Sequence, residues 1–309
     1  MKKISVVTPC FNEEANVEAL YARVKEIFLK LGAYNYEHLF IDNASTDGTQ
    51  AVLRKHAAAD KNVKVIINTR NFGHIRSPFY GLTHSEGDAS ILLVADFQDP
   101  PELINDFLKH WEAGYKVVLG IKTNSGESGL MFAVRSLYYN IVDNLAEVRI
   151  NKNNTGFGLY DREVIAQLKN LGEPYPFFRG LVSELGYEAA RVEYFQPARE
   201  RGITKNNFYT LYDIGMLGII NHSKVPLRLA IFAGALLAGL NMLVALGYFV
   251  YKLVYWNSFS VGIAPAVIGL FLFASVQLIF LGVIGEYIGA IYTQTLRRPL
   301  VIEKERINF

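Results

Sequence analysis

The sequence predicts an α/β fold with a mostly parallel sheet, followed by an amphipathic interface helix and two transmembrane helices. Short apolar, β-branched segments alternate with helical segments through the N-terminal part of the 309-residue chain. The last third holds two long, nearly uncharged apolar runs, at 229–251 and 261–284. A mostly apolar segment at 208–220, with its apolar side chains at helical spacing, precedes the first run.

Five strands and four helices are expected to alternate from the N-terminus. The expected strands are 4–8, 37–41, 63–67, 90–94 and 115–119. The expected helices are 13–31, 48–58, 75–84 and 101–111. Continuous apolar strands that alternate with helices indicate a parallel sheet covered on both faces. Ligands bind such sheets beyond the carboxyl ends of the strands.

The alternation weakens after residue 123. The expected elements here are a loop at 125–129, a helix at 130–146, a polar turn at 151–154, a helix at 159–169 and a strand at 188–196. A basic loop at 199–205 follows. We expect the segment 208–220 to lie on the membrane surface. The alternative is an ordinary helix that packs against the core.

The two apolar runs have the length of membrane spans. Each has about 23 residues, which at 1.5 Å per residue slightly exceeds the roughly 30 Å hydrocarbon core of a bilayer. The link between them holds only Lys252 as a charge, whereas basic residues lie outside the pair: Lys224, Arg228, Arg297, Arg298, Lys304 and Arg306. By the positive-inside rule both flanks face the cytoplasm. Glu286, just past the second run, is expected at the membrane interface. Two buried core helices are the alternative.

These features define the expected domains and location. The expected units are a cytosolic domain at 1–205, a juxtamembrane interface helix at 206–224, a transmembrane hairpin at 225–296 and a cytosolic tail at 297–309. No segment like a signal peptide precedes the first expected strand, so a multi-pass protein of the inner (plasma) membrane with both termini in the cytoplasm is expected. The single cysteine, Cys10, fits a reducing compartment. The net charge of +2 gives no indication of nucleic-acid binding.

Acidic residues follow three of the expected strands. They are Glu13, Asp42 and Asp96. Asp96 opens the segment Asp-Phe-Gln-Asp-Pro-Pro, in which a proline-started helix follows. Because Mg²⁺ usually takes one or two carboxylates plus substrate phosphates, Asp96, with Asp99 as a second candidate, can hold such an ion against a diphosphate. Asp99 can equally act as a helix cap.

Other strand-end segments offer contacts for a nucleotide. The segment 9–14 can present its backbone and a carboxylate, although Asn12 and Glu13 are also common capping residues. Asp42 can accept a hydrogen bond from a base N–H or a ribose hydroxyl. Arg70, in Arg-Asn-Phe-Gly-His, can reach a base or a phosphate. An exposed arginine without a ligand is the alternative there.

Together these segments resemble the GT-A fold of family 2 glycosyltransferases. The closer resemblance is to the polyprenyl-phosphate branch, the bactoprenol (undecaprenyl-phosphate) glucosyltransferases and the related dolichyl-phosphate mannosyltransferases. It covers essentially the whole chain and depends on the order and spacing of the segments 9–14, 42–49, 70–73, 96–101, 158–162, 199–205 and 285–289.

The resemblance implies roles for individual residues. The family positions that hold the nucleotide match Pro9, Phe11, Glu13 and Asp42. The position that holds a divalent cation (Mg²⁺ or Mn²⁺) and the diphosphate matches Asp96, helped by Gln98. The basic positions that meet phosphates of the donor or of the lipid acceptor match Arg199, Arg201 and Lys205. Generic attraction to anionic lipid headgroups is an alternative reading of these last three.

Three positions depart from the family pattern. Val94 stands where the pattern Asp-x-Asp-x-Gln has its first acid, and Asn43 stands where relatives have a second aspartate after the second strand. Gly156 stands where relatives often carry a polar or acidic residue. Because Val94 replaces the first acid of the pattern, an ordinary two-carboxylate cation site is in doubt, and Asp99 is a possible substitute for the missing carboxylate.

The implied reaction is an inverting transfer of a hexose from a nucleotide sugar to polyprenyl phosphate at the cytoplasmic membrane face. UDP-glucose is the first choice of donor; GDP-mannose, UDP-N-acetylglucosamine and a modified pentose donor stay open. A lipid phosphate monoester has a second pKa of about 6, so it is largely dianionic and needs no strong general base. The protein must instead bring two anions together, which calls for a cation on the donor side and basic side chains on the acceptor side.

Two other functions are weighed against this one. A processive polysaccharide synthase of the same fold carries a Gln-x-x-Arg-Trp segment and more spans, and neither Trp111 nor Trp256 has that setting. A non-catalytic membrane-bound subunit that binds nucleotide sugars is motivated by the lost acids at Val94 and Asn43. Homo-oligomerisation is left open.

Overall fold

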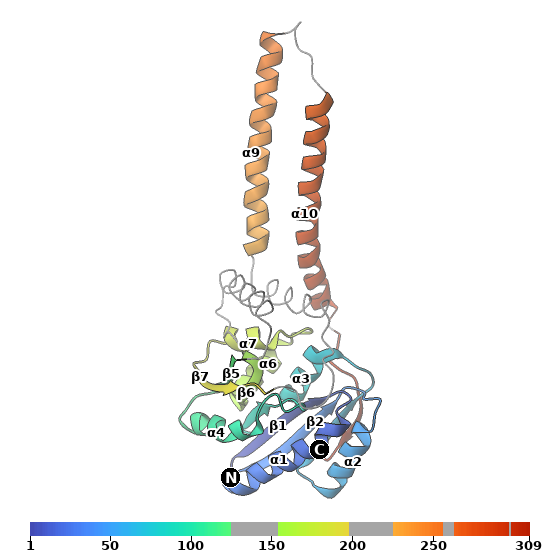
Figure 1. The fold of residues 1–309 in the computed structure, drawn as a ribbon, viewed down its shortest axis with the longest axis vertical. Helices are drawn as coiled ribbons and strands as arrows, with labels where there is room; N and C mark the ends of the chain where they lie inside the picture. Colours follow the sequence, from blue (N-terminus) through green and yellow to red (C-terminus); the bar gives the residue numbers. More distant parts are fainter. Residues whose placement is uncertain (125–153, 198–224, 256–262, 297) are drawn as a thin grey trace.

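The computed structural model describes residues 1–124, 154–197, 225–255, 263–296 and 298–309 (Figure 1). One eight-stranded sheet, in the order β7-β5-β6-β4-β1-β2-β3-β8, forms the centre of the α/β part. The predicted mostly parallel sheet is confirmed, and a pair of long helices extends away from it (Figure 1).

The N-terminal strands form the parallel half of the sheet. They are β1 (Lys3–Cys10), β2 (Asn35–Asp42), β3 (Val63–Asn68) and β4 (Ala89–Leu92). β1 lies between β2 and β4, and β3 pairs with the other side of β2. These four predicted strands are confirmed. β4 is the shortest because the chain leaves the ladder after Leu92, so Asp96 lies in the loop beyond it.

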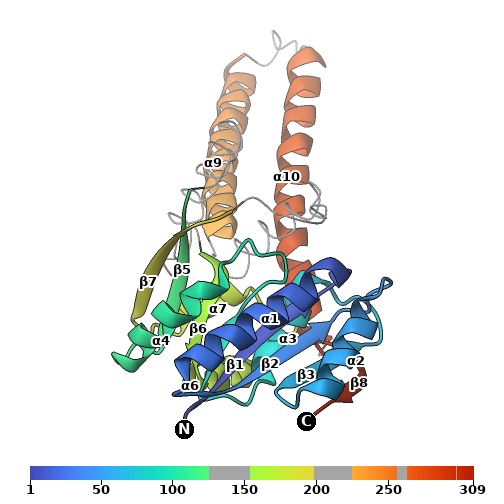
Figure 2. The same ribbon diagram turned by 60° about the horizontal axis from the view of Figure 1, so that its bottom comes forward.

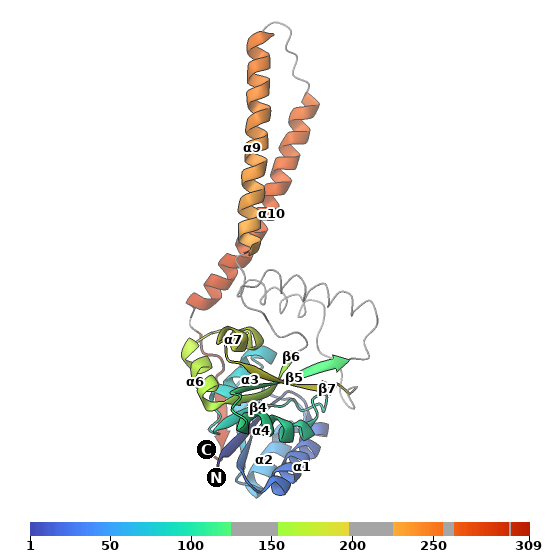
Figure 3. The same cartoon turned by 90° about the vertical axis from the view of Figure 1, so that its left-hand side faces the viewer.

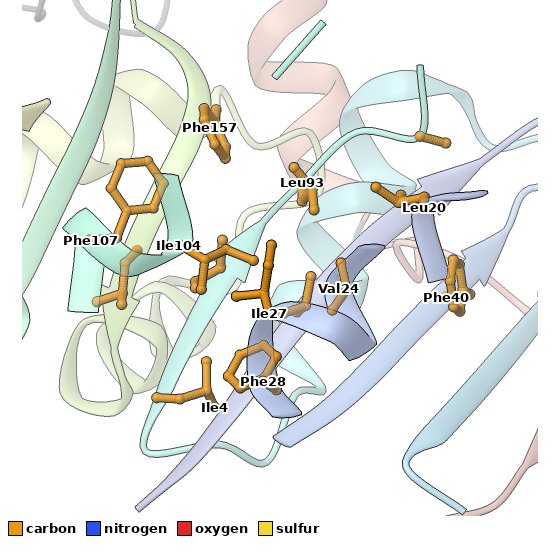
Figure 4. Close-up of a cluster of buried hydrophobic side chains, with 14 of the residues drawn as sticks. Ile4, Leu20, Val24, Ile27, Phe28, Phe40, Leu93, Ile104, Phe107 and Phe157 are labelled. Atoms are coloured by element: carbon orange, nitrogen blue, oxygen red, sulfur yellow. The ribbon is translucent and has the colours of Figure 1, made fainter. Parts of the chain in front are cut away.

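Helices cover both faces of this sheet, as predicted. α1 (Glu14–Leu31), α2 (Thr49–Ala59) and α4 (Ile104–Glu112) pack on one face, and the one-turn 3₁₀ helix η1 (Pro101–Leu103) leads into α4. Figure 4 shows Ile27 of α1 beside Ile104 of α4, in the same buried cluster as Leu20 of α1 and Phe107 of α4. α3 (Gly73–Thr83) packs on the opposite face. Burial of these apolar stripes is the main stabilising contribution.

The second half of the α/β part reverses the chain direction once. β5 (Val117–Asn124) pairs parallel with β7 (Ala189–Phe195), whereas β6 (Asn154–Asp161) runs antiparallel between β4 and β5. β6 thereby brings its first residue, Asn154, to the carboxyl ends of its neighbours. The predicted strand at 188–196 is confirmed as β7.

The helix predicted at 159–169 is wrong at its start. Residues 159–161 belong to β6, where Tyr160 is the ladder partner of Ser90, and the helix α6 begins at Arg162 and ends at Leu171. The side chain of Asp161 accepts a hydrogen bond from the Glu163 amide and caps α6. The apolar pair at 159–160 is buried between neighbouring strands, so tertiary pairing overrode helical spacing. α7 (Phe178–Glu184), also on the α3 face, was not predicted.

Two long apolar helices follow, α9 (Val225–Val254) and α10 (Ile263–Thr295). Both contain a stretch long and apolar enough to cross a membrane, and neither stretch is buried in the protein. Two core helices, the alternative considered above, are therefore excluded. Glu286 is exposed and lies inside α10, since the helix continues past the apolar run. Figure 3 shows the end of α10 turning away from α9 toward the sheet domain.

The C-terminal segment, expected as a separate tail, returns to the sheet. β8 (Glu303–Ile307) pairs antiparallel with β3 and covers that edge of the sheet (Figure 2). The Asn308 side chain donates hydrogen bonds to the carbonyls of Ala57 and Val63, at 2.6 and 2.8 Å. The tail is therefore part of the α/β domain.

Several predicted segments lie outside the described residues. They are the loop at 125–129, the helix at 130–146, the turn at 151–153, the basic loop at 199–205 and the helix at 208–220 within the expected unit 206–224.

Candidate functional site

The polar strand ends meet at one edge of the sheet. In the register of the parallel strands, Cys10 is the partner of Asp42, and Asp42 is the partner of Ile67. The loop that follows β4, with Asp96, starts beside the end of β1, because the Leu93 amide donates to the Val7 carbonyl at 2.9 Å. The structure therefore brings the three predicted strand-end segments together, as parallel topology requires.

The loop after β1 is locked onto the loop after β2. Asn12 adopts a left-handed backbone conformation (φ 57°), its amide donates to Ser45 Oγ at 2.9 Å, and its side-chain oxygen accepts from the Thr46 amide at 2.8 Å. Glu13 occupies the N-cap position of α1 but its carboxylate accepts from the Asn16 side chain instead of capping the helix. Capping therefore does not explain Asn12 or the Glu13 carboxylate. Pro9 and Phe11, next to them, are half-buried.

Asp42 is completely buried, and only one of its two carboxylate oxygens has hydrogen-bond partners among the described residues. Its Oδ2 accepts hydrogen bonds from the Ser45 amide at 3.0 Å and from Gln50 Nε2 at 2.9 Å. Its Oδ1 is buried without a hydrogen-bond partner among the described residues. An unsatisfied buried acceptor is costly, so it marks a place where a ligand N–H or O–H fits.

The neighbouring thiol is inert. Cys10 is buried, and its pKa lies well above the ordinary value. Burial is the largest cause, and the negative charges of Asp42, Glu13 and Asp47 add to it. It stays a protonated thiol and is a poor nucleophile.

Asn43 has a structural role of its own. Its side-chain nitrogen donates to Asn71 Oδ1 at 2.8 Å and to the Gly73 carbonyl at 3.1 Å. Its side-chain oxygen accepts from Asn68 at 3.1 Å and from the Phe72 amide at 2.8 Å. A carboxylate has no donor for the first two contacts. The departure from the family pattern at Asn43 therefore fits this loop and is no sign of a damaged site.

Arg70 lies exposed at the end of β3. Its guanidinium stacks over the Phe72 ring at 4.0 Å, and Nη1 donates to the Asn71 carbonyl at 3.0 Å. These contacts orient the side chain and leave most of its donors for a ligand.

Two carboxylates lie close together after β4. Asp96 Oδ1 accepts from the Gln98 amide at 3.2 Å, across Phe97 in a left-handed conformation (φ 57°). Asp99 is buried, and Tyr194 donates its hydroxyl proton to Asp99 Oδ1 at 2.6 Å. Burial and the charge of Asp96 raise the Asp99 pKa to about 6, against the lowering effects of the Tyr194 hydrogen bond and Lys122. The helix-cap interpretation of Asp99 is wrong, since Pro100 holds the N-cap position of η1 and no side chain caps it.

The carboxylate donor set suits a cation shared with a substrate. Within the described ranges, no three or more His, Cys, Asp or Glu side chains form a group that could hold a metal ion. The atoms that Asp96, Asp99 and the Gln98 side chain can offer to a cation are oxygens, the ligands of hard cations such as Mg²⁺. With Val94 in place of an acid, such a cation needs phosphate oxygens to complete its coordination. The residues therefore fit a cation held together with a diphosphate.

Some site residues escaped the sequence analysis. Tyr194 comes from β7 and Lys122 from β5, and both act on Asp99. Only the β5–β7 pairing at the far side of the sheet brings them there. The predicted basic residues Arg199, Arg201 and Lys205 lie outside the described residues.

Comparison with known families identifies the enzyme class. The sequence model of glycosyl transferase family 2 matches residues 5–168, which includes most of β1, all of β2 to β6 and the carboxylate edge, the strand ends that hold Asp42, Asp96 and Asp99. The chain belongs to glycosyl transferase family 2. It is therefore a glycosyltransferase with a GT-A-like α/β domain, and the predicted resemblance is confirmed.

Curated relatives align with nearly the whole glycosyltransferase. An uncharacterized glycosyltransferase, YkcC, of Bacillus subtilis is 36% identical over 96% of this chain and 92% of its own length. The bactoprenol glucosyl transferase of Shigella phage SfX is 34% identical over 98% of this chain and 99% of its own length. Among solved structures, the glucosyl-3-phosphoglycerate synthase of Mycobacterium tuberculosis is similar, with a TM-score of 0.47 at 19% identity over 71% of this chain and 76% of that one.

Proposed function

We propose that this glycosyltransferase moves a hexose from a nucleotide sugar to a polyprenyl phosphate at the membrane surface. One observation carries the proposal: the similarity to bactoprenol glucosyl transferases extends over 98% of this chain. It thus includes the two apolar helices α9 and α10, which a soluble acceptor would not require. The proposed location is the inner (plasma) membrane, with the α/β domain and both termini in the cytoplasm.

The proposed donor is UDP-glucose, with GDP-mannose as the alternative. The donor side comprises Pro9, Phe11, Glu13, Asp42 and Arg70. The unpartnered Oδ1 of Asp42 supports a nucleotide N–H or O–H contact. The Arg70 guanidinium, stacked on Phe72, supports a contact with a base or a phosphate.

Asp96 and Gln98 are the proposed ligands of Mg²⁺ or Mn²⁺, with Asp99 behind them. A cation held there would offset the charge that develops on the departing nucleoside diphosphate. Asp99, ionised above about pH 6, supports the cation electrostatically while its own oxygen is held by Tyr194. Because the lipid phosphate attacks the anomeric carbon directly, one displacement inverts that carbon, and no protein nucleophile is needed.

The candidate membrane helices are tied to this edge of the sheet. The segment between α10 and β8 reaches the end of β3, where the Thr69 amide donates to the Ile302 carbonyl at 2.9 Å. An acceptor whose hydrocarbon chain lies beside α10 therefore has its headgroup near the carboxylates. The basic loop with Arg199, Arg201 and Lys205 is proposed to contact its phosphate.

The test is direct transfer to lipid. Full-length protein in detergent is incubated with undecaprenyl phosphate, Mg²⁺ or Mn²⁺, and radiolabelled UDP-glucose or GDP-mannose, followed by organic extraction. Labelled lipid formed from UDP-glucose supports the proposal. Measurable nucleotide binding without labelled lipid from any nucleotide sugar would instead identify a non-catalytic binding subunit.

A further inference from the structure

An arginine on the α3 face lies beside the carboxylate edge. Arg179, the second residue of α7, donates from Nη1 to the carbonyl of Asn154 at 3.1 Å. Asn154 begins β6, and because β6 is antiparallel to β4 and β5, this carbonyl lies at their carboxyl ends. The Arg179 guanidinium is therefore at the same edge of the sheet as Asp96 and Asp99.

Electrostatic effects agree with this placement. Burial and the charge of Asp99 raise the pKa of Tyr160, whereas the charge of Arg179 lowers it. Partial desolvation and the charge of Arg179 also lower the pKa of His74, the second residue of α3. Tyr160 is thus within electrostatic reach of both Asp99 and Arg179, and His74 at the start of α3 is within reach of Arg179.

Arg179 has no anionic partner in the part of the chain that the structure describes. Among the described residues it contacts the Asn154 carbonyl and the Phe177 ring, whose centroid is 5.3 Å away. Other arginines of the domain are paired with acids, namely Arg23 with Glu102, Arg54 with Glu305 and Arg306 with Glu303. A half-buried guanidinium left with free donors is suited to a phosphate, which its planar fork binds through two N–H groups.

Arg76 also has no acid partner among the described residues, and it lies beside the segment that leads to Arg179. Arg76 of α3 stacks over the Tyr175 ring at 5.2 Å, and its Nε is buried without a hydrogen-bond partner in the described ranges. Just before Tyr175, the connection from α6 to α7 forms a pocket with the end of α10. This pocket is lined by Leu171, Gly172, Glu173, Pro174, Gln294 and Arg298.

The segment 173–179 thus runs from the end of α10 to the carboxylate edge. Arg298 lies at its start, Arg76 lies beside Tyr175 in its middle, and Arg179 is its last residue. Figure 3 shows α6 and α7 between the sheet and the end of α10. We propose that Arg179 binds the phosphate monoester of the lipid acceptor, and that Arg298 and Arg76 line the path by which this headgroup reaches it. The inference deepens the proposed function and rests on it.

The chemistry explains why a cation is needed at this point. In the transfer, a phosphate oxygen of the acceptor forms a bond with the anomeric carbon, and the bond from that carbon to the nucleoside diphosphate breaks with its electron pair. A dianionic acceptor that approaches Asp96 and Asp99 is repelled unless a positive charge accompanies it. Arg179 supplies that charge on the acceptor side and holds the attacking oxygen in place.

The test separates acceptor from donor binding in the full-length enzyme. With saturating UDP-glucose, R179Q should raise the KM for undecaprenyl phosphate about tenfold or more, and R76Q about threefold. R179K should fall between wild type and R179Q, because it keeps the charge but loses the fork. UDP binding, measured by calorimetry, should stay within about twofold. The matched control is R162Q: Arg162 is an exposed arginine that contacts the Glu86 and Gly87 carbonyls and Asp88, beyond the opposite end of β6 from Asn154.

Two results would overturn the inference. An equal loss of UDP binding in R179Q would assign Arg179 to the donor. An unchanged acceptor KM with a lowered unfolding temperature would leave it only the structural role of holding the Asn154 carbonyl. Flotation with vesicles that contain either undecaprenyl phosphate or phosphatidylglycerol gives a readout without catalysis. Weaker binding of R179Q to the first vesicles alone supports the site even if wild type transfers no sugar, an outcome that would reject only the proposed function.

Discussion

The side chains at the carboxyl edge divide into those that hold loops and those left for a ligand. Asn43 and Asn12 use their amides to join neighbouring loops. Asp42 keeps one carboxylate oxygen without a partner among the described residues. Asp99 is buried beside Asp96 and is held by Tyr194. The same edge therefore contains a hydrogen-bonded frame and a small set of acids, in which the charge of Asp96 contributes to the raised pKa of Asp99.

Restoring the family's second acid should destabilise the protein. In N43D the side chain can no longer donate to Asn71 and Gly73, and it places a carboxylate oxygen against two acceptors. We expect a loss of about 3 kcal/mol in the free energy of unfolding. Thermal unfolding of the full-length protein in detergent measures the loss. Unchanged stability with higher transfer activity would show that the site prefers an acid at this position.

The pH dependence of stability should report Asp99. Its pKa is raised to about 6 in the folded protein from 3.8, so the folded state binds this proton more tightly than the unfolded state. The contribution of Asp99 to stability is therefore greatest at low pH and declines by about 3 kcal/mol as the pH rises from about 4 to about 6. D99N should lack this decline.

Unfolding midpoints of wild type and D99N between pH 4.5 and 7.5 test the prediction. The advantage of D99N over wild type should grow as the pH rises. Y194F removes the hydrogen bond that favours the ionised form, so it should shift the decline to higher pH. Parallel pH profiles for wild type and D99N would contradict the assignment.

Asp96 should be essential for transfer but not for folding. D96A removes the proposed cation ligand, and we expect the rate of transfer to fall about 10³-fold or more. The unfolding temperature should change little, because the contact of Asp96 with the Gln98 amide is local. D106A, which removes a half-exposed aspartate paired with Lys109, is the matched control. Substantial residual activity in D96A would remove this residue from the cation role.

Among the elements, β8 has the most unexpected place. It begins eight residues after α10 ends, covers the edge of β3 and is held by the Arg54–Glu305 ion pair and the Tyr80–Glu303 hydrogen bond. An exposed strand edge invites pairing with other chains, and β8 removes that edge. It also fixes where α10 meets the domain. The C-terminus therefore both protects the sheet and anchors the candidate membrane helices.

Asn308 should contribute more to this anchor than the ion pair does. It has a left-handed backbone conformation (φ 63°), and its side chain bonds to the carbonyls of Ala57 and Val63. N308G loses the hydrogen bonds and should cost about 2 kcal/mol, whereas N308A adds backbone strain of about 1 kcal/mol. E305Q, in a half-exposed pair, should cost less than about 1 kcal/mol. The unfolding midpoint should be highest for E305Q, lower for N308G and lowest for N308A. Equal midpoints for N308A and E305Q would contradict this ranking.

The molecule as a whole combines a three-layer α/β domain with a pair of exposed apolar helices. The sheet presents its carboxyl edge and the α3, α6 and α7 layer on the side from which α9 and α10 extend (Figures 1 and 3). Side chains such as Phe232, Leu243 and Leu278 are largely exposed on these helices. Apolar surface of this extent is unfavourable in water and is suited to a bilayer.

The full-length protein should therefore behave as an integral membrane protein. After expression, alkaline carbonate should leave it in the membrane pellet, and detergent should release it. A chain that lacks residues 225–296 loses both apolar helices but keeps β8, and it serves as the comparison for peripheral attachment. Release of the full-length chain by carbonate would contradict membrane insertion of α9 and α10.

Periodicity alone was enough for the β-strand and α-helix alternation from β1 to β5, for the two apolar runs and for the shared edge of Glu13, Asp42 and Asp96. The strands, helices and apolar runs are local features of the sequence. The shared edge follows from the strands through the single rule that parallel strands end on one side of a sheet. Pairing partners far apart in sequence were decided only by the tertiary structure. Val65 meets Ile307, Tyr194 meets Asp99, and antiparallel β6 places Asn154 beside Arg179. Many strands of similar pattern can satisfy a sheet edge, so hydrophobic spacing cannot select among them; packing of the whole core does.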